Sequence, residues 1–169
     1  MQVSDVYLEL YGRIPELVHR AVDGLAPEDL TRRVRDEANT IAWLVWHLTR
    51  VQDHHIGELL GEAQRWETGG WPARFGDVDP DPQNHGYGHT PEQVAGVRPD
   101  SVATLIDYHD AVWDRTKQFL ATLTPERLDE VVDRRWDPPV TMGVRLVSVA
   151  DDCLQHAGQA AYVRGLLGR

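Results

Sequence analysis

Cysteine is almost absent from this chain of 169 residues, which contains only Cys153. A single cysteine excludes an internal disulfide and is typical of proteins of the reducing cytoplasm, which is the location we expect. The chain also lacks an apolar run near the ~20 residues that a membrane span needs. Its first residues, MQVSDVYLELYGR, contain no basic region followed by an apolar run, so no signal peptide is expected.

Positive charge is scarce as well, because 17 Lys and Arg residues face 27 Asp and Glu residues and the net charge is −10. This balance disfavours binding to nucleic acid or to an anionic membrane surface. A glycine-rich phosphate loop, a GxSxG nucleophile elbow and paired cysteines are also missing. Nucleotide binding and serine-hydrolase chemistry are therefore poorly supported.

The chain does contain four stretches of helical periodicity, in which apolar residues recur every three or four positions. Pro15 interrupts the first stretch, which is therefore either two pieces or one kinked helix. Four helices of roughly 20 residues predict an all-α four-helix bundle, and the length suits one domain, 1–169. In order, the stretches are 4–12 with 15–24, 39–60, 100–123 and 141–167.

The connection between the second and third helices, residues 61–99, is long and rich in glycine and proline. We expect it to be mostly irregular yet ordered. Within it, Thr90-Pro91-Glu92-Gln93 combines an N-cap, a proline at the first helical position and a capping-box glutamine, which predicts a short helix at about 91–96. Loops of this length in compact domains are commonly functional or form an interface.

A short sequence pattern occurs once in each half of the chain, as a weak internal repeat. The segment Leu25-Ala26-Pro27-Glu28-Asp29-Leu30 follows the first helix, and Leu123-Thr124-Pro125-Glu126-Arg127-Leu128 follows the third, 98 residues later. Either two helix pairs are related by pseudo-symmetry, or two helix ends are similar by chance.

The fourth helix carries an aspartate and a histidine on an otherwise apolar stripe. Asp152 and His156 are four residues apart, so they project from one face, one turn apart. Polar groups on such a stripe are costly to bury without partners, and this pair can bind one metal ion. His47, within the apolar segment 43–48, would complete a 2-His-1-carboxylate set of metal ligands.

Other interpretations of these residues stay open. Asp152 alternatively caps or pairs locally, while His156 and His47 are ordinary core histidines. Cys153 competes with Asp152 as a ligand, because positions i and i+3 also share a helix face.

Three further residues are predicted to line a pocket at this group: His54, His109 and Trp43. His54 lies about 10 Å from His47 along the helix axis, which is too far for it to share the metal directly. His109 is, in decreasing order of expectation, a core histidine, a pocket residue or a fourth ligand. Trp43 alternatively fills the core. The other histidines are expected at the surface, in turns or at an interface: His19, His55, His85 and His89.

Three segments of the chain resemble the DinB/YfiT-like superfamily in their order and spacing: NTIAWLVWHL at 39–48, GYGHTP at 86–91, and HAGQ through YVRG within 156–165. The resemblance covers nearly the whole chain. It implies a four-helix bundle of this type that holds a divalent metal, often zinc or nickel. His47 and His156 match the two histidines of the family pattern, and Asp152 stands where the family more often has histidine or glutamate.

The resemblance also implies a class of reaction. Relatives include the metal-binding domain of mycothiol-dependent maleylpyruvate isomerase and bacillithiol S-transferase, which use a low-molecular-weight thiol such as mycothiol. We therefore expect a metal-dependent thiol S-transferase, or a related enzyme, that acts on a small electrophile and forms a homodimer. The alternatives are a non-catalytic metal- or ligand-binding homodimer and a metal-dependent hydrolase.

Overall fold

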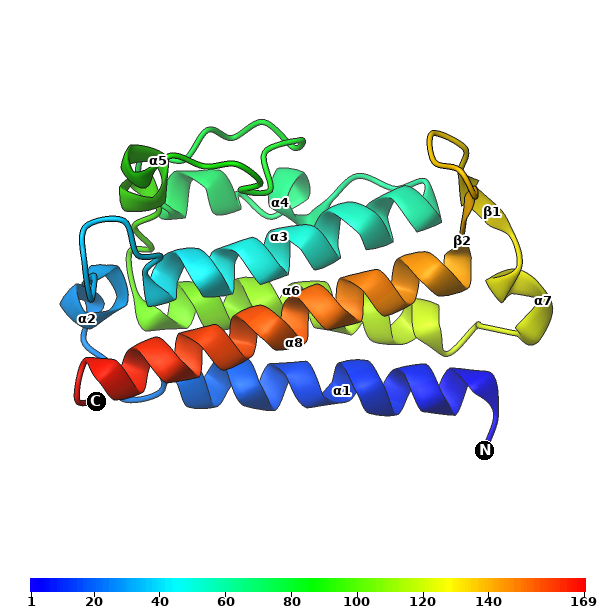
Figure 1. Ribbon diagram of the computed structural model, residues 1–169, viewed down its shortest axis with the longest axis horizontal. Helices are drawn as coiled ribbons and strands as arrows, with labels where there is room; N and C mark the ends of the chain where they lie inside the picture. The colour runs from blue at the N-terminus through cyan, green and yellow to red at the C-terminus, as the bar shows by residue number, and fades with distance from the viewer.

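Four long helices form a bundle in the computed structural model, which describes residues 1–169 (Figure 1). Two of them, α1 and α8, run in one direction, and α3 and α6 run in the opposite direction. The predicted all-α bundle is confirmed, and α1 is one continuous helix that contains Pro15. The helices are α1 (Val3–Val22), α3 (Ile41–Leu60), α6 (Val102–Leu120) and α8 (Met142–Leu166).

Hydroxyl side chains fix where three of these helices begin. The side chains of Thr40, Ser101 and Thr141 each accept a hydrogen bond from the backbone N–H three residues later. Such N-caps provide acceptors for N–H groups that have no partner within the helix. Helix α3 is therefore capped by Thr40, one residue beyond the Asn39 cap that the sequence predicts.

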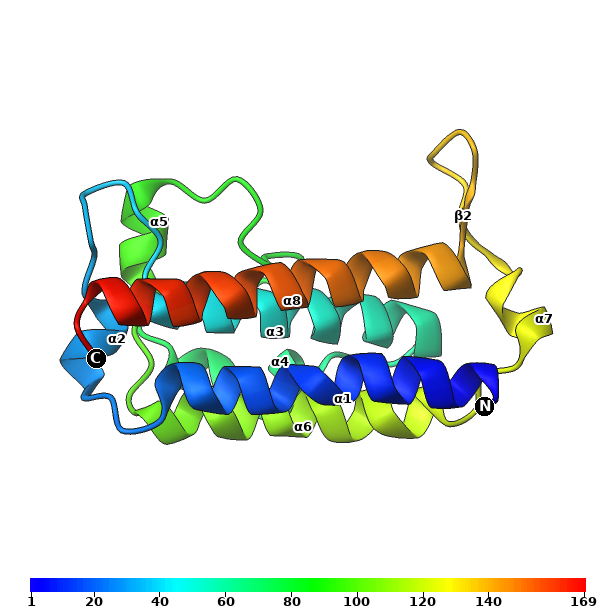
Figure 2. The same ribbon diagram turned by 60° about the horizontal axis from the view of Figure 1, so that its bottom comes forward.

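The two halves of the internal repeat adopt equivalent structures. Each forms a short helix with proline at its first turn, α2 (Pro27–Thr31) and α7 (Pro125–Leu128). Each then leads into one of the two long helices that pack most extensively on each other, α3 and α8. Figure 2 shows α2 and α7 at opposite ends of the bundle.

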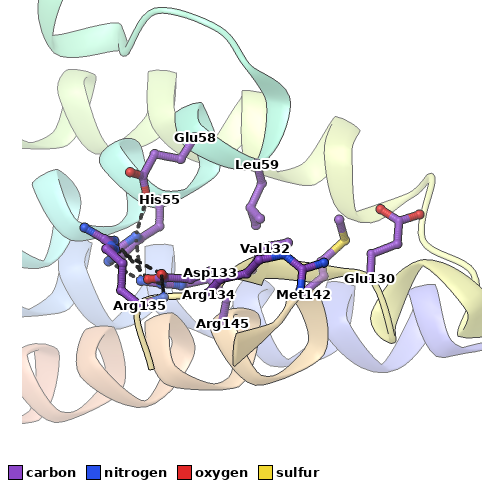
Figure 3. A pocket seen from close by; sticks show the side chains of 10 residues that line it. All are labelled: His55, Glu58, Leu59, Glu130, Val132, Asp133, Arg134, Arg135, Met142 and Arg145. Carbon is purple, nitrogen blue, oxygen red and sulfur yellow. Dashed lines mark hydrogen bonds and ion pairs between the residues drawn. The ribbon is translucent and has the colours of Figure 1, made fainter. Parts of the chain in front are cut away.

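A small hairpin that the periodicity does not predict lies between α7 and α8. Strand β1 (Val131–Asp133) pairs antiparallel with β2 (Val140–Thr141). It covers a cavity of about 570 Å³ beside the end of α3 and the start of α8, which we call the polar pocket (Figure 3). Its lining residues are His55, Glu58, Leu59, Glu130, Val132, Asp133, Arg134, Arg135, Met142 and Arg145.

The long crossover between α3 and α6 contains three short helical segments, so it is less irregular than predicted. They are α4 (Arg65–Thr68), the 3₁₀ turn η1 (Trp71–Arg74) and α5 (Pro91–Gly96), of which only α5 is predicted from the sequence. Trp66 and Phe75 are fully buried, which shows that the crossover contributes to the core.

Buried charges hold the crossover against α3. The carboxylate of Asp53 accepts hydrogen bonds from the backbone N–H groups of Arg65 at 2.9 Å and Trp66 at 2.7 Å. The Tyr108 hydroxyl donates to the same carboxylate at 2.9 Å, and Arg115 forms an ion pair with it. These donors offset the cost of burying the Asp53 charge, and removing the carboxylate would leave its buried partners without an acceptor.

Helix α3 is the centre of the molecule, since 16 of its 20 residues are buried. It is covered by α8, α6, α2 and the crossover, which explains why its sequence is apolar on nearly every side. The polar side chains buried on α3 are therefore the ones that need explanation. None of the helices combines the length and apolar character that crossing a bilayer requires.

Candidate metal centre

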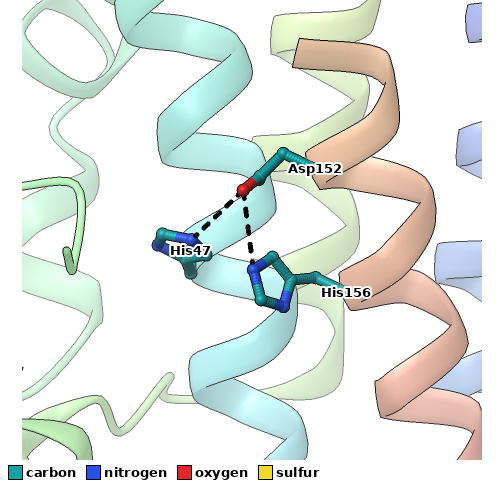
Figure 4. A group of neighbouring side chains, drawn as sticks. All are labelled: His47, Asp152 and His156. Atoms are coloured by element: carbon teal, nitrogen blue, oxygen red, sulfur yellow. Dashed lines mark ion pairs between the residues drawn. The ribbon is translucent and has the colours of Figure 1, made fainter. Parts of the chain in front are cut away.

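The structure brings His47, Asp152 and His156 together where α3 packs against α8 (Figure 4). One potential ligand atom from each lies within 4.8 Å of the other two. The Asp152 Oδ1 atom is 3.9 Å from His47 Nε2 and 3.6 Å from His156 Nε2. The three side chains that the helical spacing singles out therefore face one another.

The hydrogen bonds of the two imidazoles leave both Nε2 atoms free to bind a cation. His47 Nδ1 contacts the backbone carbonyl of His85, and His156 Nδ1 lies 2.8 Å from the side-chain oxygen of Gln159. A carbonyl oxygen can only accept, so in the neutral form of each ring Nδ1 carries the proton and Nε2 carries a lone pair. This arrangement, in which the second nitrogen is held by an oxygen, is the usual state of a metal-binding histidine.

Asp152 supplies the negative charge of the group, and its second oxygen has no partner. The Oδ2 atom is buried and makes no hydrogen bond, although the side chain as a whole is 32% exposed. An unpartnered buried carboxylate oxygen is costly, and a cation held by this carboxylate would lower that cost.

The spacing of the three ligand atoms also fits a metal ion. Tetrahedral bonds of 2.0–2.2 Å place ligand atoms about 3.3–3.6 Å apart. Of the two separations that involve Asp152 Oδ1, 3.6 Å falls in that range and 3.9 Å is a few tenths of an ångström longer. Although aspartate is one methylene shorter than glutamate, Asp152 reaches both imidazoles.

Aromatic packing fixes the orientation of the His47 ring. Trp43 stacks on it with ring centroids 4.6 Å apart and an angle of 7° between the planes. The Trp43 indole donates to His89 Nδ1 at 3.1 Å, and His89 Nε2 lies 2.8 Å from the amide oxygen of Asn84. Trp43 thus lies beside the group, and it belongs to the core as well, since it is only 6% exposed.

Gly86 allows the crossover to approach His47 closely. Its φ is +96°, and a Cβ atom there would lie 2.9 Å from His47 Nδ1 and 2.9 Å from the Trp46 ring. Only glycine fits both the backbone conformation and the space. The His85 carbonyl can therefore reach the imidazole.

His85 and His89 are not the solvated turn residues that the sequence suggests. Both are half-buried against α3, and burial lowers the pKa of each, that of His85 to about 4. Sequence reasoning also missed Gln159, although its spacing of three residues from His156 places it one turn away. His19 is a surface residue as expected, 3.0 Å from Asp110.

Cys153 and His109 lie elsewhere in the core. The Cys153 thiol is fully buried and donates to the Leu48 carbonyl at 3.4 Å, and burial raises its pKa well above the ordinary value. His109 is fully buried 3.2 Å from the Thr49 hydroxyl, and burial lowers its pKa to about 4. Neither residue belongs to the group formed by His47, Asp152 and His156.

His54 belongs to a second histidine group, with His55 and Glu58, near the polar pocket. His54 Nε2 is 3.6 Å from Glu58 Oε1, and its Nδ1 is 3.2 Å from the side-chain amide nitrogen of Gln64. The His54 ring lies against the His85 ring, with centroids 5.3 Å apart and an angle of 50° between the planes. The crossover therefore contacts both histidine groups, through His85.

Comparison with known proteins identifies relatives over nearly the full chain. The family model described as mycothiol-S-transferase matches residues 13–168. A crystal structure of a conserved protein from Enterococcus faecalis has a TM-score of 0.91 and 32% sequence identity, and the match covers 100% of this chain and 99% of that one. No curated protein matches.

Proposed function

The chain belongs to the mycothiol-S-transferase family, within the DinB/YfiT-like superfamily, and on that premise we propose that it transfers a low-molecular-weight thiol to a small electrophile with the help of a divalent metal. One observation carries the proposal. Two imidazole Nε2 atoms with free lone pairs converge on a carboxylate that has a buried, unpartnered oxygen.

In this proposal His47, Asp152 and His156 hold the metal. Two imidazole nitrogens and one carboxylate oxygen suit zinc, and imidazole also suits nickel. Three protein ligands leave a coordination position open, which is the pattern of catalytic rather than structural zinc sites. The residues that the sequence offers as a fourth ligand, Cys153 and His109, lie outside the group.

The metal, when bound, supplies positive charge that lowers the pKa of a thiol and so provides a thiolate at neutral pH. The thiolate sulfur forms a bond to an electrophilic carbon as the bond from that carbon to its leaving group breaks. The leaving group departs with the electron pair, and the thiol proton passes to solvent. His47 and His156 keep their Nδ1 protons throughout, because the His85 carbonyl and the Gln159 amide hold them.

The test compares Asp152→Ala with Asp151→Ala, a neighbouring exposed aspartate that bonds to Gln155 instead. Metal content is measured by mass spectrometry of the purified protein, and thioether formation from mycothiol and a chloronitroarene is followed with and without a chelator. We expect wild type and Asp151→Ala to bind one metal per chain and form the thioether, and Asp152→Ala to lose both properties. A fully metal-loaded wild type that conjugates no low-molecular-weight thiol would overturn the proposal.

We also propose that the protein is a homodimer. Its support is the resemblance to the family. Sedimentation of the metal-loaded protein over a wide concentration range tests it directly. A monomer at all concentrations would overturn this part and leave the proposed chemistry intact.

A further inference from the structure

A second pocket, which we call the arginine pocket, lies between the loop that follows α2 and the carboxyl-terminal end of α8. Its volume is about 670 Å³, and Figures 1 and 2 show the two segments side by side. Its wall is apolar and open to solvent, with exposed fractions of 39% for Val34, 69% for Tyr162 and 55% for Leu166. Exposed apolar surface in a pocket indicates a binding site.

The same pocket has three arginines and no acidic residue in its lining: Arg32, Arg33 and Arg35. Arg33 donates to the backbone carbonyls of Asp36 and Pro91. Arg32 and Arg35 form no ion pair and no side-chain hydrogen bond, so their guanidinium groups are available. Asp36 and Glu37 follow in the loop but do not line the pocket. In a chain whose net charge is −10, this local excess of positive charge favours an anionic occupant.

The arginine pocket lies beyond the candidate metal centre toward the carboxyl-terminal end of α8, and one of its lining residues, Val163, shares the helix face of Asp152 and His156. Arg145, Asp152, His156 and Val163 follow one another at spacings of seven, four and seven residues. At about 100° per residue these positions project within about 40° of one another. Val163, which lines the arginine pocket, is about 10 Å from His156 along the helix axis at 1.5 Å per residue.

The polar pocket at the other end of this face differs in its charge balance. Two of its three arginines are paired, since Asp133 forms ion pairs at 2.9 Å with both Arg135 and Arg145 (Figure 3). Glu58 and Glu130 line it as well, so three acidic residues stand against its three arginines. The two pockets therefore flank the candidate metal centre, and of the two only the arginine pocket has arginines without any acidic residue in its lining.

We infer that the arginine pocket binds the electrophile, and that this electrophile is a small organic anion with an apolar body. The anionic group lies at Arg32 and Arg35, and the body lies on the apolar wall with its reactive end toward His156. That the bound anion is the electrophile rests on the proposed thiol transfer. That the pocket binds such an anion is independent of it.

A binding experiment tests the pocket without metal or turnover. The probes are 8-anilinonaphthalene-1-sulfonate, which is an apolar anion, and N-phenyl-1-naphthylamine, which has the same body without the sulfonate. We expect Arg32→Gln with Arg35→Gln to raise the Kd of the sulfonate probe at least about tenfold, since hydrogen bonds to charged groups are lost. The Kd of the neutral probe should stay the same, and circular dichroism confirms the fold.

Two further variants make the binding result specific. Arg134→Gln removes one positive charge from the polar pocket and should leave both probes unaffected. Leu166→Glu places a carboxylate on the exposed apolar wall and should weaken both probes. Sulfonate binding that is unchanged in the double variant, or equally weakened by Arg134→Gln, would overturn the inference.

A kinetic experiment separates the inference from the proposed function. It compares an anionic electrophile, 4-chloro-3-nitrobenzoate, with a neutral one, 1-chloro-2,4-dinitrobenzene. In both reactions a carbon–sulfur bond replaces the carbon–chlorine bond and chloride leaves. In the double arginine variant the KM for the benzoate should rise about tenfold, with the KM for the neutral electrophile and both kcat values unchanged. Thiol transfer with both KM values unchanged would overturn the inference alone. Intact sulfonate binding without any transfer would overturn the proposed function and, with it, the occupant's role as electrophile.

Discussion

Two histidine groups lie two turns apart on α3, and their chemistry differs because the crossover presents an acceptor to one and a donor to the other. His47 and His54 are seven residues apart and face nearly the same way. At His47 the crossover presents a carbonyl oxygen, that of His85, which keeps the proton on Nδ1. At His54 it presents an amide N–H₂ group, that of Gln64, which keeps Nδ1 unprotonated and the proton on Nε2.

The orientation of the Gln64 amide is fixed by its own partners. Its oxygen accepts from Arg50 Nη1 at 2.7 Å, and its nitrogen donates to the Pro82 carbonyl at 3.0 Å. The Nε2–H of His54 then faces Glu58, 3.6 Å away. The nearby His55 Nδ1 is within 3.2 Å of both Arg145 Nη1 and Glu58 Oε2. Proximity of ligand atoms alone therefore does not make a metal site, because the partners of each ring decide which nitrogen is available.

The largest expected effect comes from removing one histidine from each group. His47→Ala should reduce zinc affinity by more than about 100-fold, because loss of a ligand exceeds the 10–100-fold cost of losing one of its supporting partners. His54→Ala should leave one zinc bound per chain with unchanged affinity. Isothermal titration calorimetry on both variants measures this. Loss of zinc from His54→Ala but not from His47→Ala would reverse the assignment of the two groups.

The next comparison concerns the contact between the crossover and His47. Gly88→Ala should lower the free energy of unfolding by about 1 kcal/mol, the cost of alanine in a left-handed conformation. Gly86→Ala, which also has a positive φ, should lower it by about 3 kcal/mol, because its Cβ meets His47 and Trp46. It should also weaken zinc binding by displacing the His85 carbonyl. Urea titration compares the two, and equal losses of stability would show that the close approach is unimportant.

A smaller effect is expected from the hydrogen-bond partner of His156, the second histidine that we propose as a ligand. Gln159→Ala removes the acceptor for His156 Nδ1–H and should weaken zinc binding about 10–100-fold without a change in fold. Gln155→Ala is the matched control, since Gln155 is exposed on the same helix and bonds to Asp151 instead. Competition with a chromophoric chelator measures both affinities. If the two variants bind zinc equally well, Gln159 does not orient His156.

The last comparison concerns the pH dependence of stability in the presence of chelator. Burial lowers the pKa of His55 and of His109 to about 4 from the ordinary 6.5. Between these values the unfolded chain binds more protons than the folded one, so stability is fully present above pH 6.5 and falls as the pH decreases toward 4. His109→Leu should make that fall shallower, as chemical denaturation at several pH values will show. An unchanged slope would mean that His109 does not contribute to acid sensitivity.

The sequence predicts the parts of this molecule that depend on local periodicity. The four long helices, the capped helix at 91–96 and the shared face of Asp152 and His156 all follow from spacing along one segment. Which nitrogen of His47 is free does not, because it depends on a carbonyl 38 residues away. The glycines at 86 and 88 signal an unusual backbone there, but helical periodicity cannot place a loop against a helix.

The hairpin and the partners of His54 escape prediction for the same physical reason. Strands β1 and β2 contain three and two residues, too few for an alternating pattern to be recognised. The protonation of His54 depends on Gln64, whose amide is in turn held by the Pro82 carbonyl, and both residues reach this position through the fold of the crossover. Residue types and spacing find candidate ligands, whereas contacts between distant segments decide among them.

The Asp53 carboxylate has a consequence for the entropy of metal binding. By holding the backbone of Arg65 and Trp66, it anchors the beginning of the crossover whose later residues hold His47. The ordering of that loop is thus completed during folding, and a metal entering the group has no chain left to immobilise. A variant without the Asp53 carboxylate would have to order its crossover when the metal binds. Its metal affinity would fall, although Asp53 contacts none of the three proposed ligands.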